Sequence, residues 1–136
     1  MSTTQAETLT VVVERELAHP PEKVWRALTQ PHLIEAWLMK SDFRAEVGAA
    51  FHMDAEWGGV DGQVLEIEPN RTLAYTWAGK GLESVVTWTL TPVGGGTRLR
   101  MEQTGFRPDQ QLAYRGATAG WPRFLGALEE VLAGLD

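Results

Sequence analysis

The stretch HPPEKVWRALTQPHLIEAWL, residues 19–38, decides the fold because it interrupts an extended segment with two short helices that each begin near a proline. Proline is tolerated in the first turn of a helix, where its missing N–H removes no hydrogen bond. The apolar positions recur at helical spacing: Val24, Trp25 and Leu28, then Leu33, Ile34, Trp37 and Leu38. This pattern predicts one helix over residues 21–29 and a second over residues 32–38.

The residues on either side of this stretch are typical of β-strands. Before it, residues 8–18 alternate and are rich in β-branched side chains, so that one face is apolar except for Arg15. After it, the apolar pattern predicts strands at residues 49–57, 63–68, 72–78, 84–91 and 97–104. The glycine-rich residues 58–62 and 94–96 predict turns. The order is therefore a strand, two short helices, about six antiparallel strands and a helical C-terminus.

The C-terminal segment carries one apolar stripe at helical spacing: Ala117, Trp121, Phe124, Leu125, Leu128, Val131, Leu132 and Leu135. Pro108 and Asp109 can start this segment, with Asp109 as a helix cap. Pro122 lies inside the stripe, lacks an N–H donor and clashes with the carbonyl four residues earlier. We therefore predict a kink or break near Gly120 and Trp121, with a regular helix over about residues 121–134.

These elements predict an α+β fold, in which a curved antiparallel sheet buries its inner face against the long C-terminal helix. A strongly curved sheet leaves a gap beneath the helix, and this gap is the expected place for a ligand. Length favours a single domain over residues 1–136, since domains commonly have about 100–200 residues. We expect residues 1–7 to be flexible.

Composition excludes several classes of protein. There are no cysteines, so disulfides, cysteine-based metal sites and cysteine nucleophiles are ruled out. The net charge of −6 argues against nucleic-acid or anionic-membrane partners, which need a basic surface. No apolar run approaches the roughly 20 residues of a membrane span, and residues 1–5 do not begin a secretory signal. We expect a cytoplasmic protein.

The polar residues give no pattern that carries catalysis or binds a metal. His19, His32 and His52 show no metal-binding spacing, so we predict no metal and no cofactor. No serine lies in a nucleophile elbow, and the three glycines at residues 94–96 are not followed by a phosphate-binding helix. The acidic pairs at residues 54 and 56 and at residues 66 and 68 are typical of a solvated strand face. No residue is assigned a catalytic role.

Four longer segments resemble a known family: HPPEKVWRALTQPHLIEAWL (19–38), GQVLEIEPNRTLAYTW (62–77), SVVTWTLTPVGGGTRLRMEQTGF (84–106) and GWPRFLGALEEVL (120–132). Together they resemble the homologues of the activator of heat-shock-protein-90 ATPase, within the START-like (SRPBCC, Bet v allergen-like) superfamily. The resemblance covers nearly all of residues 8–134. It implies a helix-grip fold, in which an antiparallel sheet wraps around the C-terminal helix and two small helices close one end.

The resemblance implies several functions rather than one, because a fold does not fix an activity. Members of the superfamily bind hydrophobic ligands, act as polyketide cyclases or aromatases, sequester toxic compounds or assist a chaperone. In the eukaryotic chaperone cofactor, a separate N-terminal domain supplies much of the chaperone contact. Only about 20 residues precede the first predicted helix here, which argues against a chaperone partner.

We predict that a small, hydrophobic, aromatic or polyketide-like ligand lies between the sheet and the C-terminal helix. Aromatic and methionine side chains supply contact area, while Arg15, Tyr75 and Gln103 orient the ligand, since a dry core rarely contains such polar groups. The predicted ligand-binding residues are Arg15, Trp37, Phe51, Met53, Trp57, Tyr75, Trp77, Trp88, Met101, Gln103, Tyr114, Thr118, Trp121 and Leu125.

Three alternatives stay open at the level of sequence. Core packing alone accounts for many of these positions, and Arg15 has the alternative of a structural salt bridge at the rim. An enzyme acting on such a ligand would use Tyr75 as the acid or orienting group. A stress-related protein-interaction module resembling the chaperone activator would need a contiguous exposed apolar patch. A homodimer is compatible with the sequence, which neither favours nor excludes it.

Overall fold

The computed structural model describes residues 8–54, 58–79 and 81–135. The expectation for residues 1–7 and the ligand-binding prediction for Trp57 lie outside the described residues, as does the end of the predicted strand at residues 55–57. In the described part of the chain, no helix is both long enough and apolar enough to cross a bilayer.

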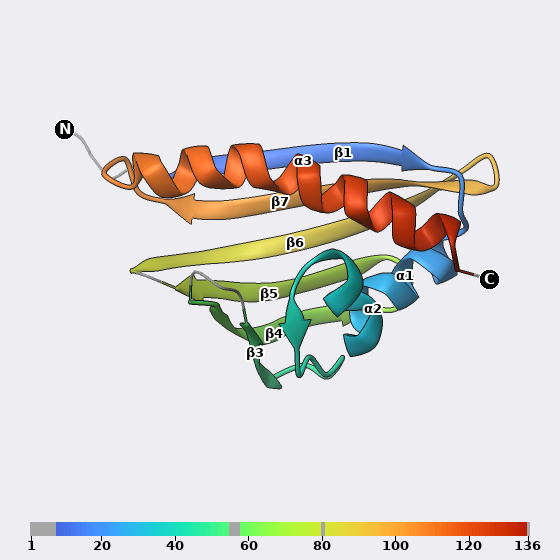
Figure 1. The fold of residues 1–136 in the computed structure, drawn as a ribbon, viewed down its shortest axis with the longest axis horizontal. Helices are drawn as coiled ribbons and strands as arrows, with labels where there is room; N and C mark the ends of the chain where they lie inside the picture. The colour runs from blue at the N-terminus through green and yellow to red at the C-terminus, as the bar shows by residue number, and fades with distance from the viewer. Residues whose placement is uncertain (1–7, 55–57, 80, 136) are drawn as a thin grey trace.

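Ten described elements form the fold (Figure 1). In order they are β1 (Leu9–Leu17), α1 (Pro21–Thr29), α2 (Pro31–Trp37), β2 (Lys40–Ser41), β3 (Ala50–Asp54), β4 (Val60–Glu68), β5 (Thr72–Gly79), β6 (Leu82–Val93), β7 (Gly96–Phe106) and α3 (Gln111–Ala133). The strands make one antiparallel sheet in the order β1-β7-β6-β5-β4-β3-β2. The chain therefore reaches from one sheet edge to the other through α1 and α2.

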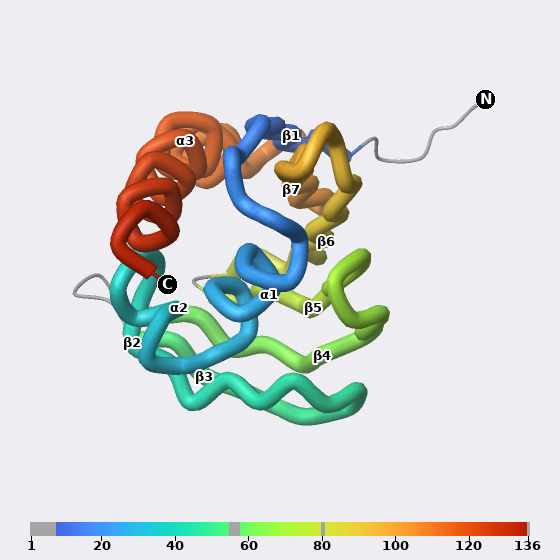
Figure 2. The backbone as a smooth tube through the Cα atoms, turned by 90° about the vertical axis from the view of Figure 1, so that its right-hand side faces the viewer, coloured from blue at the N-terminus to red at the C-terminus, as the bar shows by residue number. Residues whose placement is uncertain are grey.

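The sheet curves around α3, as the view along the helix shows (Figure 2). The helix packs against β1, α1, α2 and β7, and so closes the space between the two ends of the sheet. The two short helices cover one end of the resulting barrel-like shape. The predicted α+β, helix-grip arrangement is confirmed.

The inner face of the sheet and the facing side of α3 form one apolar core. The alternation predicted from sequence holds, because the inward positions of the strands are buried: Phe51, Met53, Leu73, Tyr75, Trp77, Val86, Trp88, Leu90, Leu99, Met101 and Gln103. From α3, the buried positions are Trp121, Leu125, Leu128 and Leu132. Trp88 lies at the centre, edge-on to both Trp37 and Trp121, with ring centroids 5.7 Å apart in each pair.

Of the predicted kink or break near Gly120 and Trp121, the break is wrong, and so is the predicted start of the helix at about residue 121. Helix α3 runs without interruption from Gln111 to Ala133 and contains Pro122. Proline removes one hydrogen bond of the helical ladder, while packing on both sides holds the helix in place. Before the proline, Tyr114 packs edge-on against Phe106 with ring centroids 5.6 Å apart. Asp109 does not cap the helix and instead pairs with Arg107.

Several strand limits also differ from the prediction. The two-residue strand β2 was not predicted, and β4 begins at Val60, inside the predicted turn at residues 58–62. Gly62 explains that error, because its lack of a side chain reflects close packing rather than a turn. A Cβ there would overlap the Phe51 ring and the carbonyl oxygen of Thr76. The strands β6 and β7 are each longer than predicted, and the turn between them is confined to Gly94 and Gly95.

Candidate functional site: a cavity beneath the first half of α3

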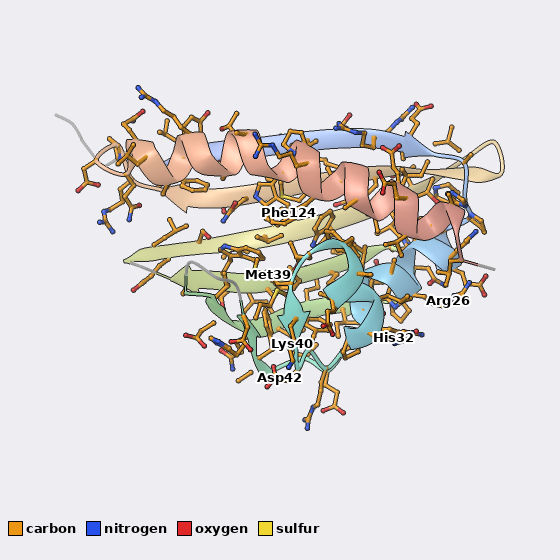
Figure 3. All side chains as sticks on the ribbon, viewed as in Figure 1. Arg26, His32, Met39, Lys40, Asp42 and Phe124 are labelled. Atoms are coloured by element: carbon orange, nitrogen blue, oxygen red, sulfur yellow. The ribbon has the colours of Figure 1, made fainter. Side chains whose placement is uncertain are left out.

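A cavity of about 630 Å3 lies between the first half of α3 and the ends of β5, β6 and β7. Its walls include Met39, which precedes β2, and Phe124 of α3 (Figure 3). The other lining residues are Val60, Trp77, Gly79, Leu82, Gln103, Phe106, Asp109, Gln110, Gln111, Leu112, Ala113, Gly116, Ala117 and Gly120. Most of this surface is apolar, and the polar residues other than Gln103 gather at the start of α3.

Small residues on α3 create the empty volume. Ala113, Gly116, Ala117 and Gly120 are spaced by three, one and three positions, so they share one face of the helix. A Cβ added at Gly116 or Gly120 would meet no atom within 4 Å. The helix therefore stands over the sheet without filling the space beneath it. Further along, Trp121 and Leu125 are buried and close that space.

The mouth of the cavity is polar, and a hydrogen bond joins its two sides. The Gln110 side-chain amide donates to the carbonyl oxygen of Gly81 at 3.1 Å, which joins the start of α3 to the β5–β6 hairpin. The same side chain accepts a hydrogen bond from the backbone N–H of Arg107 at 2.9 Å. Beside this bridge, Leu112 is 85% exposed. An apolar side chain at a polar rim is a suitable contact for a molecule that enters the cavity.

A relay of buried hydrogen bonds supports the cavity wall. The indole N–H of Trp121 donates to Gln103 Oε1 at 2.7 Å, and Gln103 Nε2 donates to Ser84 Oγ at 2.9 Å. The Ser84 hydroxyl then donates to the backbone carbonyl of Trp77 at 2.8 Å. The relay links α3, β7, β6 and β5, and it satisfies polar groups that would otherwise be costly to bury.

Tyr75 lies outside the cavity, in the aromatic core. Its hydroxyl oxygen accepts a hydrogen bond from the indole N–H of Trp88 at 3.0 Å, and its ring packs edge-on against Phe43 and Phe51. Burial raises the pKa of the Tyr75 phenol well above its ordinary value, although the hydrogen bond from Trp88 opposes this shift. A phenol with so high a pKa, away from the cavity, is a poor acid or base for a bound molecule.

Two of the predicted ligand-binding residues, Trp77 and Gln103, line the cavity. Several others are buried in the core beside it and do not reach its wall: Trp37, Phe51, Met53, Tyr75, Trp88, Met101, Trp121 and Leu125. Trp37 uses its indole N–H within the fold, donating to the carbonyl oxygen of Ala27 at 2.8 Å. The structure thus separates the aromatic core from the cavity next to it.

The remaining predicted residues lie on β1 and α3: Arg15 and Tyr114 are half-buried, and Thr118 is exposed. Arg15 forms an ion pair with Glu129 of α3 at 3.5 Å and its side chain is 34% exposed, so it joins the sheet edge to the helix. The Thr118 hydroxyl donates to the carbonyl oxygen of Tyr114 at 2.8 Å, one turn earlier. Neither Thr118 nor Tyr114 lines the cavity.

Sequence reasoning missed most of the cavity, because it placed the start of the regular helix at about residue 121. Apart from Ala117, the lining residues between 109 and 120 therefore had no assigned face. The signal that could have found them was the helical spacing of small residues at 113, 116, 117 and 120. Read as one helix face, that spacing predicts a helix that leaves room beneath it.

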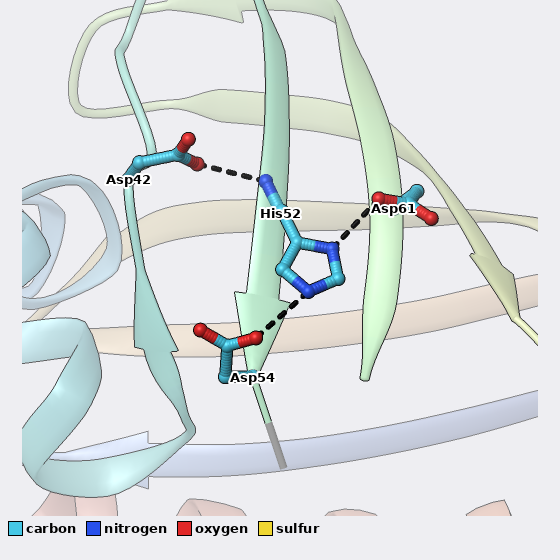
Figure 4. Close-up of polar contacts among 4 residues, drawn as sticks. All are labelled: Asp42, His52, Asp54 and Asp61. Atoms are coloured by element: carbon cyan, nitrogen blue, oxygen red, sulfur yellow. Dashed lines mark hydrogen bonds and ion pairs between the residues drawn. The ribbon is translucent and has the colours of Figure 1, made fainter. Parts of the chain in front are cut away.

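A second polar cluster lies on the exposed side of β3 (Figure 4). The His52 ring contacts Asp61 Oδ1 through Nδ1 at 2.7 Å and Asp54 Oδ1 through Nε2 at 2.8 Å. The backbone N–H of His52 donates to Asp42 Oδ1 at 2.8 Å. Among the described residues, no group of such side chains is arranged to hold a metal ion. The cluster is an ion-pair network that joins β3 to β4 and to the segment after β2.

This network predicts a pH-dependent stability. Hydrogen bonding to Asp61 is the largest cause that raises the pKa of His52; some desolvation opposes it, and Asp54 adds to it. Because the folded pKa lies above the unfolded one, the contribution is complete below about pH 6.5 and is lost as the pH rises through the raised folded value. In urea titrations, the stability difference between the wild type and His52→Gln is therefore expected to shrink from about pH 5.5 to about pH 9.

An NMR titration of the His52 ring provides the control. The Asp61→Asn variant removes the carboxylate that contributes most to the raised pKa of His52. In this variant the His52 pKa should therefore fall toward its ordinary value. A stability difference that stays constant over this pH range would contradict the prediction.

Fold and cavity together define a helix-grip protein with a largely apolar cavity beneath its C-terminal helix. The family described as Activator of Hsp90 ATPase homolog 1-like protein matches residues 18–133, and the chain belongs to it. No curated protein matches the chain.

Solved structures share the fold over nearly the whole chain. Protein MLL2253 from Mesorhizobium loti is 59% identical, with a TM-score of 0.90 over 94% of this chain and 99% of that one. DynU16, from the dynemicin biosynthetic locus, is 30% identical, with a TM-score of 0.81; the match covers 91% of this chain but 47% of DynU16. The Aha1 dimer from Colwellia psychrerythraea is 20% identical, covers 91% of this chain and 96% of that one, and has a TM-score of 0.77, so it shows the fold alone.

Proposed function

We propose that the chain is a binding protein for a small, hydrophobic, aromatic or polyketide-like molecule, which it holds in the cavity beneath α3. The observation that carries this proposal is the cavity of about 630 Å3 with largely apolar walls. Ligand sites commonly have volumes of about 300–1,000 Å3 and combine apolar walls with a few polar groups. The similarity to DynU16, which comes from a biosynthetic locus, supports a small molecule as the occupant.

The residues around the cavity favour binding over catalysis. Among the described lining residues, Asp109 is the one titratable side chain, and it lies exposed at the mouth. Its carboxylate is paired with Arg107 at 3.2 Å. Acid–base catalysis on a bound molecule needs a titratable group within reach of the reacting atoms. Tyr75, the candidate from sequence, lies in the core outside the cavity.

The exposed apolar residues also favour an internal ligand over a protein-docking surface. The large hydrophobic side chains exposed in the described part of the chain are Val12, Val47, Leu65, Val93 and Leu112. They lie on four different elements and on the segment between β2 and β3. Single exposed apolar residues are ordinary on protein surfaces, whereas docking surfaces are contiguous.

A thermal-shift screen tests the proposal. The purified protein would be melted with flavonoids, polyketide-like phenols, sterols and fatty acids. A ligand present at about 100 times its dissociation constant adds about 2.7 kcal/mol to the free energy of unfolding. For a domain of this size, we expect the melting temperature to rise by roughly 8–14 °C with the matching class. A cooperative melt that no class shifts would contradict the proposal.

Filling the cavity tests where such a ligand binds. Gly120 and Gly126 are both half-buried glycines of α3, and a Cβ at either would meet no atom within 4 Å, but Gly120 alone of the two lines the cavity. We expect Gly120→Leu to weaken binding at least tenfold in calorimetric titrations, because its side chain occupies the ligand volume. The matched control Gly126→Leu should bind as the wild type does. Equal loss in both variants, or in neither, would place the ligand elsewhere.

A further inference from the structure

The cavity wall contains one buried polar side chain among its described residues, Gln103 of β7. It is 1% exposed, and it lies among apolar lining residues that include Trp77 and Phe106. The other polar side chains that line the cavity, those of residues 109, 110 and 111, are at the mouth. Polar groups set into an apolar wall orient a bound molecule. Gln103 is therefore the group that a ligand meets at the inner end.

The orientation of the Gln103 amide is fixed by chemistry at both ends. An indole N–H can only donate, so the atom that faces Trp121 at 2.7 Å must be the amide oxygen. The Ser84 hydroxyl donates its hydrogen to the carbonyl oxygen of Trp77. Its oxygen must therefore accept a hydrogen bond from the Gln103 amide nitrogen, which lies 2.9 Å away. Turning the amide over would place two donors together at one end and two acceptors at the other.

This relay leaves half of the amide available. A glutamine amide has two N–H groups and two acceptor lone pairs. Trp121 takes one lone pair and Ser84 takes one N–H. Within the described residues, one donor and one acceptor of Gln103 remain for a molecule in the cavity. A hydroxyl group can use both, and a carbonyl group can use the donor.

The described residues of the cavity wall carry no positive charge. None of the described lining residues is a lysine, arginine or histidine. Arg107, which precedes Asp109 at the exposed mouth, does not line the cavity and pairs with Asp109. A carboxylate at the inner end would face one amide N–H and apolar side chains, and a buried charge without a partner is strongly disfavoured.

We propose that the cavity selects an uncharged ligand, in which an apolar ring system carries a hydroxyl or carbonyl group that hydrogen-bonds to Gln103. This inference rests on the proposed function and makes Gln103 the specificity-determining residue of the site. Carboxylate-bearing molecules of the same shape are rejected at the inner end.

Calorimetric titration of the wild-type protein with three matched probes tests the selection. Naphthol, methylnaphthalene and naphthoate share one ring system, substituted at the same position. At neutral pH the hydroxyl of naphthol is protonated and naphthoate is ionised, as the ordinary pKa values of phenols and carboxylic acids require. We expect naphthol to bind at least tenfold more tightly than methylnaphthalene or naphthoate. Loss of naphthol binding in Gly120→Leu would place the probe in the cavity.

A variant assigns the preference to Gln103. In Gln103→Met, which keeps an unbranched side chain but loses the amide, naphthol and methylnaphthalene should bind within threefold of each other. If this variant does not melt cooperatively, the wild-type comparison still decides the proposal. Equal binding of naphthol and methylnaphthalene to the wild type, or tighter binding of naphthoate, would overturn the inference and leave the proposed function standing. Binding of none of the three probes would count against both.

Discussion

Replacing Trp88 with alanine is expected to lower the free energy of unfolding by about 3–5 kcal/mol. Trp88 is 0% exposed, and its ring lies edge-on to Trp37 and Trp121. Alanine would leave a large void at the centre of the core and would remove the indole N–H that donates to the Tyr75 hydroxyl. A close-packed interior relaxes only partly around such a void, so both losses lower stability.

Urea unfolding followed by circular dichroism measures this change. A chain of this length has a total stability of roughly 7–20 kcal/mol, so the variant should still fold. Thr89→Ala is the control, because Thr89 lies next to Trp88 on the outer face of β6, and its change should stay within about 1 kcal/mol. A loss at Trp88 no larger than that of the control would show that the centre of the core is loosely packed.

Replacing Pro122 with alanine is expected to raise the free energy of unfolding by about 2 kcal/mol. Pro122 lies inside α3, where it cannot donate to the carbonyl oxygen of Thr118. Inside a helix, alanine is favoured over proline by about 3 kcal/mol. Proline also lowers the conformational entropy of the unfolded chain. Replacing it with alanine therefore lowers the free energy of unfolding by up to about 1 kcal/mol through this second effect. The difference between these two effects is the expected gain.

Pro108, outside the helix, provides the control for this gain. It lies exposed before α3, so Pro108→Ala removes the restriction on the unfolded chain without repairing a helix. We expect it to lower stability by less than about 1 kcal/mol, opposite in sign to Pro122→Ala. Both would be measured by urea unfolding. A loss of stability in Pro122→Ala would mean that the proline shapes α3 to fit the sheet.

Most of the fold could be predicted from the sequence because it depends on local patterns. Helix α1 begins at Pro21 and ends at Thr29 as predicted, since its limits are set by one proline at its start and another after its end. Strand faces were also predictable, because a period of two assigns every residue to one side of a sheet. The predictions of a turn at residues 58–62 and of a break near Gly120 were wrong because local patterns do not decide the structure at those positions. At Gly62 and Pro122, contacts between distant segments outweigh the local preference.

The cavity was less predictable than the fold because it arises where side chains are missing or small, and such positions give a weak sequence signal. Large aromatic residues indicate a hydrophobic interior, but Trp88, Trp121 and most of their neighbours fill that interior with each other. The open space lies where α3 presents Gly116 and Gly120. Sequence reasoning did identify Gln103 and Trp77, whose inward positions follow from strand alternation, and both line the cavity.

The order of strands in the sheet has a consequence for synthesis of the chain. Strand β1 is made first, yet its partner β7 ends at Phe106, so Leu9 pairs with a residue that leaves the ribosome almost a hundred positions later. The meander from β3 to β7 can form step by step, since each strand pairs with the one before it. Its inner face stays uncovered until α3 arrives. The newly made chain therefore carries an unpaired β1 until β7 has emerged, and an open apolar sheet face until α3 follows.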